Sequence, residues 1–196
     1  MKLPKTIFLL AVLALMLAPA LAACAPNNTI IVGGNPGATP SATATAVNSA
    51  PLPAPGRTAP AISLTSLQGQ TVKLSDFLGK PVLVNFFATW CGPCRSEMGY
   101  LQSVDQNPEF QQAGFTLIEV NIQEDAGTVQ KFLQDNGLDF SSLLLDTDAV
   151  AAQAYNVNGI PASFFIDRNG IIQKVKIGAY ADQTALERDV QALINR

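Results

Sequence analysis

Histidine is absent from all 196 residues, and the chain has only three cysteines, Cys24, Cys91 and Cys94. Zinc and iron–sulfur sites are built mainly from these two residue types, and a copper-binding site would also use histidine. We therefore expect no metal. Basic residues are also scarce, because 12 lysines and arginines face 15 aspartates and glutamates. This charge balance argues against nucleic acid as a partner.

Residues 1–23 have the composition of a secretory signal. Two lysines, Lys2 and Lys5, precede an apolar run over residues 7–17 and then a stretch of small residues. The run is shorter than the roughly 20 residues of a membrane-spanning helix. The tetrapeptide Leu-Ala-Ala-Cys, which ends at Cys24, resembles the bacterial lipobox, where a peptidase cuts before a cysteine that carries lipid. We predict a lipoprotein signal and a lipid anchor on Cys24; an ordinary signal with an incidental cysteine is the alternative.

Residues 24–60 differ in composition from the rest of the chain. They are rich in Pro, Ala, Thr, Ser, Gly and Asn, and Arg57 is their only charged residue. Such a segment cannot bury enough apolar surface to offset the entropy lost on ordering. We predict a disordered stalk with an r.m.s. reach on the order of 30–35 Å. Without the two lysines of the signal, ten basic residues face 15 acidic ones, a net charge of −5.

From residue 61 onward, apolar runs alternate with turn signals. The nearly continuous apolar run over 81–87 is typical of a strand buried on both faces, and a helix is expected over 93–107. Further strands are expected over 62–64, 71–74, 115–122, 143–145, 163–167 and 171–177, and further helices over 75–78, 127–136, 149–155 and 182–195. Asn-Gly at 169–170 predicts a hairpin between the last two strands. The order predicts an α/β domain whose mixed sheet is preceded by a β-hairpin.

Cys91 and Cys94 stand three positions apart at the start of the helix that follows the first buried strand. Unpaired N–H groups and the macrodipole stabilise a thiolate at a helix N-terminus, so Cys91 is the expected attacking thiol. Cys94 lies one turn later and would resolve the mixed disulfide. A metal site lacks further ligands, and a purely structural disulfide would close only a short loop. The pair therefore predicts disulfide exchange through a redox-active disulfide, without a cofactor.

Two segments carry a resemblance to a known family. Residues 82–98 read Val-Leu-Val-Asn-Phe-Phe-Ala-Thr-Trp-Cys-Gly-Pro-Cys-Arg-Ser-Glu-Met, and Gly-Ile-Pro at 159–161 precedes the last hairpin. Together they resemble the TlpA/ResA-like membrane-anchored thioredoxins of the AhpC/TSA-redoxin type. The resemblance extends over residues 61–196. It implies a thioredoxin fold, with a central mixed sheet flanked by helices.

The resemblance also implies roles for residues around the cysteines. Trp90 is expected to be an exposed aromatic that helps to dock an unfolded peptide, although it could instead fill the core. Gly92 and Pro93 shape the turn and resemble the pair of reducing thioredoxins. Pro161 matches the cis-proline that faces the cysteines, where it would leave the backbone of Ile160 free to pair with an extended substrate. An ordinary turn proline is the alternative.

Asn85 and Glu97 set this chain apart from cytoplasmic thioredoxins. Those proteins resemble it but have a buried aspartate at the position of Asn85, and an amide cannot accept the proton of the resolving thiol. Glu97 follows Cys94 by three residues, so it shares a helical face with that cysteine. It matches an acidic residue of the TlpA/ResA-like proteins. We predict that Glu97 accepts the proton of Cys94, with Asn85 as a hydrogen-bonding neighbour; a solvated glutamate is the alternative.

The resemblance implies a monomeric protein-disulfide reductase at the extracytoplasmic face of the membrane. Its expected substrates are disulfides in exported proteins, with apocytochrome c during cytochrome c maturation as the leading candidate. A membrane dithiol carrier is the expected electron donor, because no nucleotide-binding motif is visible. The alternatives are a non-enzymatic thioredoxin-fold binding module and a thiol peroxidase of the peroxiredoxin type. Resemblance to peroxiredoxins would require a threonine where this chain has Ala88.

Overall fold

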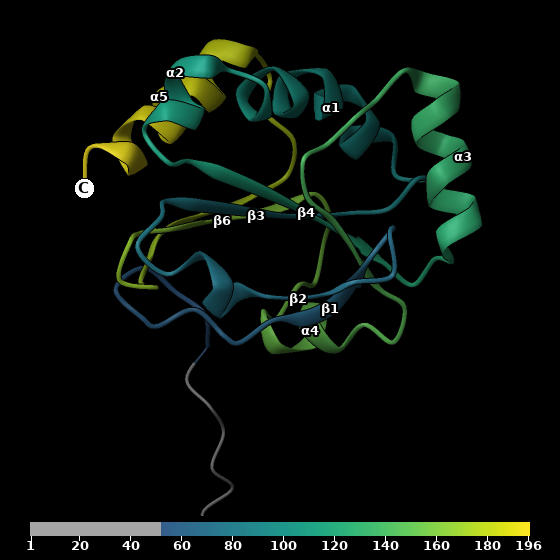
Figure 1. Cartoon of the computed structure of the whole chain (residues 1–196), viewed down its shortest axis with the longest axis horizontal. Coiled ribbons are helices and arrows are strands. Elements are labelled where there is room, and N and C mark those ends of the chain that lie inside the picture. Colours follow the sequence, from purple (N-terminus) through teal and green to yellow (C-terminus); the bar gives the residue numbers. More distant parts are fainter. Residues whose placement is uncertain (1–51) are drawn as a thin grey trace, which may run out of the picture. The chain divides into compact units, whose positions relative to one another are not determined.

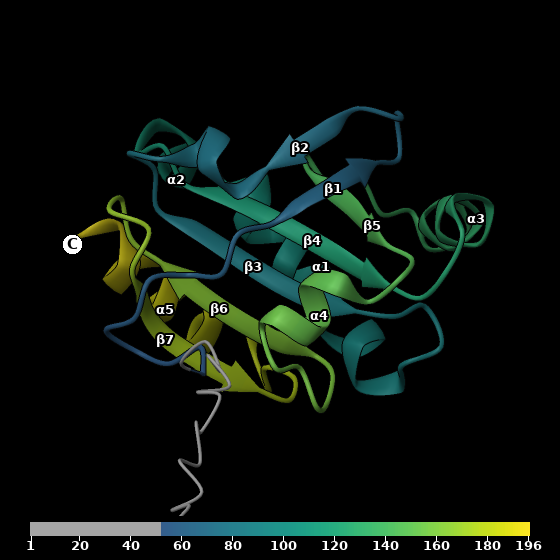
Figure 2. The same cartoon turned by 90° about the horizontal axis from the view of Figure 1, so that it is seen from below.

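A computed structural model describes the protein over residues 52–196. These residues form a seven-stranded mixed sheet with helices on both faces (Figures 1 and 2). The predicted signal, the lipidation site Cys24 and most of the predicted stalk lie outside the described residues. Among the helices of the described part, none is long and apolar enough to cross a membrane.

The strands lie side by side in the order β2-β1-β5-β4-β3-β6-β7. They are β1 (Ser63–Ser66), β2 (Thr71–Lys73), β3 (Val82–Phe87), β4 (Thr116–Ile122), β5 (Leu143–Asp146), β6 (Ala162–Ile166) and β7 (Ile172–Ile177). β3, β4 and β5 run parallel, and β6 and β7 complete one side of the sheet in antiparallel pairing. The predicted mixed sheet and N-terminal hairpin are confirmed, and the hairpin joins the sheet through an antiparallel pair of β1 with β5.

Helices cover both faces of this sheet. They are α1 (Gly92–Asp105), α2 (Pro108–Gln112), α3 (Ala126–Asn136), α4 (Val150–Ala154) and α5 (Gln183–Ile194), with a 3-10 helix at Leu74–Phe77. Figure 1 shows α1 and α5 on one face and α4 on the other. The helix α2 is missing from the sequence-based expectation. Its signals are Asn107, whose side chain accepts from the N–H of Glu109, and a proline in its first turn.

The alternation of side chains along β3 divides the core into two parts. Val82, Val84 and Phe86 pack on the side of α4, whereas the residues between them face α1 and α5. Every residue of β3 is buried because helices cover the sheet from both sides. Asn85 is the polar exception in this strand, and its position in the alternation places it on the α1 face.

The ordered pairing begins a few residues before the predicted boundary at residue 60. The N–H of Gly56 donates to the carbonyl of Ile172 at 2.7 Å, and the N–H of Ile172 donates to the carbonyl of Arg57 at 2.8 Å. Thr58 also forms an isolated bridge with Ile171. The stalk therefore ends earlier than its composition indicates, because these bonds depend on a partner more than 100 positions away.

Candidate active site

The two cysteines lie at the start of α1, directly after the loop that leaves β3. Cys91 is the N-cap of the helix, and its Sγ accepts from the N–H of Cys94 at 3.1 Å. The two residues are joined by a disulfide. Cys91 keeps 3% of its surface exposed, whereas Cys94 is completely buried. Cys91 is therefore the less enclosed of the two sulfurs, as expected of the attacking thiol, and Cys94 is the more enclosed one, as expected of the resolving thiol.

The loop before β6 lies against Cys91, although 69 positions separate the contacting residues. The peptide bond between Ile160 and Pro161 is cis. The carbonyl oxygen of Ile160 lies 3.8 Å from Sγ of Cys91. The residue Pro161 is also held by the segment after β7, because its carbonyl accepts from the N–H of Gly178 at 2.8 Å. The structure thus brings both predicted residues of this loop to the disulfide.

The loop between β3 and α1 presents Trp90 to solvent with 70% of its surface exposed, so this side chain does not fill the core. Gly92 and Pro93 follow in the exposed first turn of α1. The loop is held by Glu124, which accepts from the N–H of Thr89 at 2.7 Å and from its hydroxyl. Glu124 is absent from the sequence-based prediction, since nothing near it in sequence connects it with the cysteines.

Glu97 is completely buried on α1, so the alternative of a solvated glutamate is wrong. Its Oε2 accepts from the N–H of Tyr180 at 2.7 Å, while its Oε1 is buried without a hydrogen-bond partner. Burial raises the pKa of Glu97 to about 7, against the smaller, opposing effects of the Tyr180 N–H and the positive charge of Lys176. A carboxyl with this pKa can accept and return a proton near neutral pH.

Asn85 belongs to a row of polar residues that crosses the sheet on the α1 face. In the strand register it neighbours Glu119 of β4 and Ser163 of β6. Its Nδ2 donates to Oε2 of Glu119 at 3.0 Å, and its Oδ1 accepts from the hydroxyl of Ser163 at 3.0 Å. Lys176 of β7 lies opposite Ser163 and extends the row. Asn85 therefore bonds to side chains of both adjacent strands, and among the described residues no hydrogen bond joins it to Glu97.

Glu119 is a second buried carboxyl at the site, and the sequence-based prediction does not include it. Burial raises the pKa of Glu119 well above its usual range; the hydrogen bond from Asn85 lowers it, and the negative charges of Glu97 and Asp105 raise it further. Its Oε1 has no hydrogen-bond partner. A usable signal was present, since a glutamate interrupts the apolar run over 115–122. The buried carboxyl therefore stands one strand away from the position that holds the aspartate in cytoplasmic thioredoxins.

The site combines a dithiol–disulfide couple with two buried carboxyls. Within residues 52–196 there is no cluster of three or more Cys, Asp or Glu side chains that could hold a metal ion. The chemistry that these groups can support is the transfer of two electrons between the Cys91–Cys94 pair and another dithiol or disulfide.

Comparisons with known proteins agree with this chemistry. Residues 55–175 match the AhpC/TSA family. The chain is 36% identical over 138 residues to the thiol-disulfide oxidoreductase ResA of Geobacillus kaustophilus (strain HTA426). The aligned residues cover 70% of this chain and 77% of that relative. A crystal structure from Chlorobium tepidum, described as a thiol:disulfide interchange protein DsbE, matches with a TM-score of 0.66 and 34% identity over 72% of this chain and 99% of its own. A secreted Mycobacterium tuberculosis disulfide oxidoreductase homologous to E. coli DsbE matches with a TM-score of 0.59 and 28% identity over 67% and 96% of the two chains.

Proposed function

Because the chain belongs to the AhpC/TSA family and is a thiol–disulfide oxidoreductase, we propose that it works as a reductase of disulfides in exported proteins. The observation that carries this proposal is the Cys91–Cys94 pair at the start of α1, with the Ile160 carbonyl against the more exposed cysteine. The helix N-terminus favours a thiolate at Cys91. The Gly-Pro pair between the cysteines, which resembles that of reducing thioredoxins, supports the reductive direction.

The cycle starts from the dithiol form. The Cys91 thiolate attacks one sulfur of a substrate disulfide, so that a mixed disulfide forms and the other substrate sulfur leaves as a thiolate and takes up a proton. Cys94 then loses its proton and attacks Sγ of Cys91, which closes the Cys91–Cys94 disulfide and releases the second substrate thiol. In the complete cycle, two electrons and two protons pass to the substrate. An external dithiol carrier at the membrane then reduces the Cys91–Cys94 disulfide back to the dithiol.

Glu97 is the proposed acceptor of the Cys94 proton. Both residues are buried on α1, three positions apart, where water cannot readily take up that proton. A carboxyl with a pKa of about 7 is half ionised at neutral pH and can pass the proton on to the leaving thiolate. Asn85 contributes indirectly, because it holds Glu119, whose pKa is raised first by burial and then further by the charge of Glu97.

The proposed binding surface consists of Trp90 and the loop at Ile160 and Pro161. An extended substrate segment would pair with the backbone of Ile160 while its cysteine meets Cys91. The exposed indole would cover apolar side chains next to that cysteine. Such a surface accepts an unfolded chain, which is the state of apocytochrome c before haem attachment. We include cytochrome c maturation in the proposal for this reason.

We place the protein at the extracytoplasmic side of the membrane, as a monomer tethered by lipid on Cys24. The signal-like composition of residues 1–23 supports export, and one structural relative is described as secreted. A Cys24→Ala variant is expected to leave the membrane fraction and to lose incorporation of a labelled fatty acid. Unchanged membrane association of that variant would contradict the anchor.

The reductase proposal is tested by trapping the substrate. A Cys94→Ser variant, expressed in the host, is expected to accumulate a mixed disulfide through Cys91, because the resolving attack is blocked. The partner can be identified by mass spectrometry after reduction. The double variant Cys91→Ser, Cys94→Ser is the control and should trap nothing. Failure of Cys94→Ser to retain any exported protein through a disulfide would contradict the proposal.

A further inference from the structure

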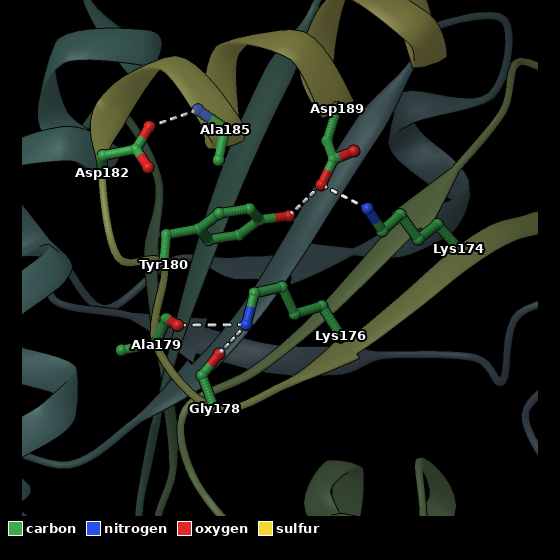
Figure 3. A network of polar contacts seen from close by, with 8 residues as sticks. All are labelled: Lys174, Lys176, Gly178, Ala179, Tyr180, Asp182, Ala185 and Asp189. Atoms are coloured by element: carbon green, nitrogen blue, oxygen red, sulfur yellow. Dashed lines mark hydrogen bonds and ion pairs between the residues drawn. The ribbon is translucent and has the colours of Figure 1, made fainter.

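One peptide group connects two opposite charges behind the active site. The N–H of Tyr180 donates to Oε2 of Glu97 at 2.7 Å, and the carbonyl of Ala179, which belongs to the same peptide, accepts from Nζ of Lys176 at 3.0 Å. Nζ also donates to the carbonyl of Gly178 at 2.8 Å (Figure 3). An ammonium at the carbonyl and a carboxylate at the N–H polarise the same amide in the same direction, so each bond strengthens the other.

We propose that Lys176 is a positioning residue for the release step, which acts through the Ala179–Tyr180 peptide to favour the ionised form of Glu97. This inference rests on the proposed role of Glu97 as the acceptor of the Cys94 proton. It adds a residue of β7 to the groups that determine at which pH the resolving attack takes place.

The position of Lys176 is fixed by the fold. It lies opposite Ser163 in the register of β6 and β7, at the end of the polar row that continues through Asn85 to Glu119. It is half-buried, and its Nζ lies 4.9 Å from the centroid of the Tyr180 ring. Two carbonyls and an aromatic face thus hold the ammonium in place. This environment differs from that of a surface lysine, which moves freely in water.

Tyr180 is also held at its other end. Its hydroxyl donates to Oδ2 of Asp189 at 2.6 Å, and Asp189 forms an ion pair with Lys174 (Figure 3). Asp182 caps α5 by accepting from the N–H of Ala185 at 2.8 Å. The bond from Tyr180 to Asp189 and the cap by Asp182 fix the loop between β7 and α5, in which Lys174 has no hydrogen-bond partner, so the N–H of Tyr180 stays directed at the carboxylate.

The charged and titratable groups around Glu97 come from several elements. Burial raises the pKa of Glu97, the N–H of Tyr180 lowers it, and the positive charge of Lys176 of β7 lowers it further. Glu119 of β4 is coupled to Glu97 by repulsion, and Asp105 of α1 acts on Glu119 in the same sense. Loss of the ammonium would leave the effect of burial on the pKa of Glu97 less opposed. Glu97 would then hold its proton to higher pH and accept the Cys94 proton less readily at pH 7.

The test follows the release step directly. The full-length chain carries Cys24→Ala, so that Cys91 and Cys94 are the two reacting thiols, and its reduced form is mixed with dithiobis(nitrobenzoate). The first thionitrobenzoate leaves when Cys91 attacks, and the second leaves when Cys94 resolves the mixed disulfide. In Lys176→Met, the pH midpoint of the second phase is expected to rise by about 0.5–1 unit, which slows release roughly three- to tenfold below the midpoint.

Two further variants separate this effect from general changes of charge or stability. Lys174→Met removes the same charge two positions away, where the partner is Asp189, and should leave the midpoint unchanged. Lys176→Arg keeps the charge and should retain most of the wild-type midpoint. This variant tests the effect of the charge even if Lys176→Met folds poorly. An unshifted midpoint in Lys176→Met, or an equal shift in Lys174→Met, would overturn the inference.

Glu97→Gln in the same assay distinguishes this inference from the proposed function. If Glu97→Gln loses the midpoint near pH 7 while Lys176→Met keeps the wild-type value, the role of Glu97 stands and that of Lys176 fails. If Glu97→Gln keeps the wild-type midpoint, Glu97 is not the acceptor and both assignments fail. A shift in Lys176→Met together with loss of the midpoint in Glu97→Gln supports both.

Discussion

Asn85 on β3 donates a hydrogen bond of 3.0 Å to Glu119 on β4, and the two residues are direct neighbours in the parallel register. The same amide accepts from Ser163, so it has a partner on each adjacent strand. This pairing places a buried carboxyl under α1, where it is coupled to Glu97. Since two interacting carboxyls titrate as a pair, proton uptake at the site depends on both residues.

The Asn85–Glu119 bond should contribute strongly to stability. Asn85→Ala removes the donor and leaves a buried carboxyl without its partner, so we expect the free energy of unfolding to fall by about 2–4 kcal/mol. Ser163→Ala removes only the hydroxyl on the other side and should cost about 1 kcal/mol. Urea unfolding at pH 7 measures both. A loss below that of Ser163→Ala would show that Asn85 does not stabilise Glu119.

Glu97→Gln should slow the release step. An amide cannot accept the Cys94 proton, so we expect a loss on the order of a hundredfold or more at pH 7, in line with the usual effect of a general base. The initial attack by Cys91 should change much less. Glu109→Gln, at an exposed position on α2, is the matched control and should behave like the wild type. Equal release rates in Glu97→Gln and Glu109→Gln would remove Glu97 from the mechanism.

The burial of Glu97 also predicts how stability depends on pH. Its pKa rises from the usual 4.5 to about 7 in the folded state, so the folded protein binds more protons than the unfolded chain between these values. The contribution of Glu97 to stability therefore falls as pH rises from about 4.5 to 7 and stays reduced above pH 7. Glu97→Gln has no carboxyl and does not lose stability in this way. Between pH 5 and pH 8, its free energy of unfolding should therefore rise by about 1–3 kcal/mol relative to that of the wild type.

Denaturant unfolding of both proteins at pH 5 and pH 8 checks this sign. The difference between Glu97→Gln and the wild type should be smaller at pH 5, because most of the wild-type carboxyl remains protonated in the folded state. A pH-independent difference would mean that the carboxyl keeps its ordinary pKa after folding.

Trp90→Ala should weaken the reduction of protein disulfides without loss of fold stability. The side chain is 70% exposed, so its removal takes little from the core and removes an apolar face beside Cys91. We expect KM for insulin to rise roughly three- to tenfold, and the reaction with dithiobis(nitrobenzoate) to change little. Leu78→Ala is a suitable control, because Leu78 is similarly exposed, at 66%. It precedes β3, whereas Trp90 lies in the loop that leads from the end of β3 to Cys91. An unchanged KM in Trp90→Ala would exclude the indole from substrate binding.

Peroxide should be a poor substrate. Ala88 is completely buried and offers no hydroxyl where a peroxiredoxin-type site requires a threonine. We expect the reduced protein to consume hydrogen peroxide no faster than an ordinary thiolate does, roughly four or more orders of magnitude below a diffusion-limited enzyme. Peroxide consumption in the presence of excess dithiothreitol measures this rate. Rapid turnover that depends on Cys91 would favour the peroxidase alternative.

The sequence by itself determined the elements that depend on local pattern. Three elements have bounds within one or two residues of the prediction: the strand β3, the helix that begins after Cys91, and the hairpin formed by β6 and β7. Short-range periodicity, helix capping and turn residues encode such features. The spacing of Cys91 and Cys94 likewise predicted the disulfide, because both residues lie in one turn of one helix.

Only the tertiary structure decided how distant residues complete the site. Glu119, Ser163 and Lys176 join Asn85 through the register of four strands, and the N–H that reaches Glu97 belongs to a residue 83 positions later. Strand register and loop packing arise from the whole core, so no local window contains them. The pKa of Glu97 depends on the same packing, because desolvation by surrounding elements is its main cause. The sequence placed a carboxyl near Cys94, and the fold made it a group that can exchange protons near neutral pH.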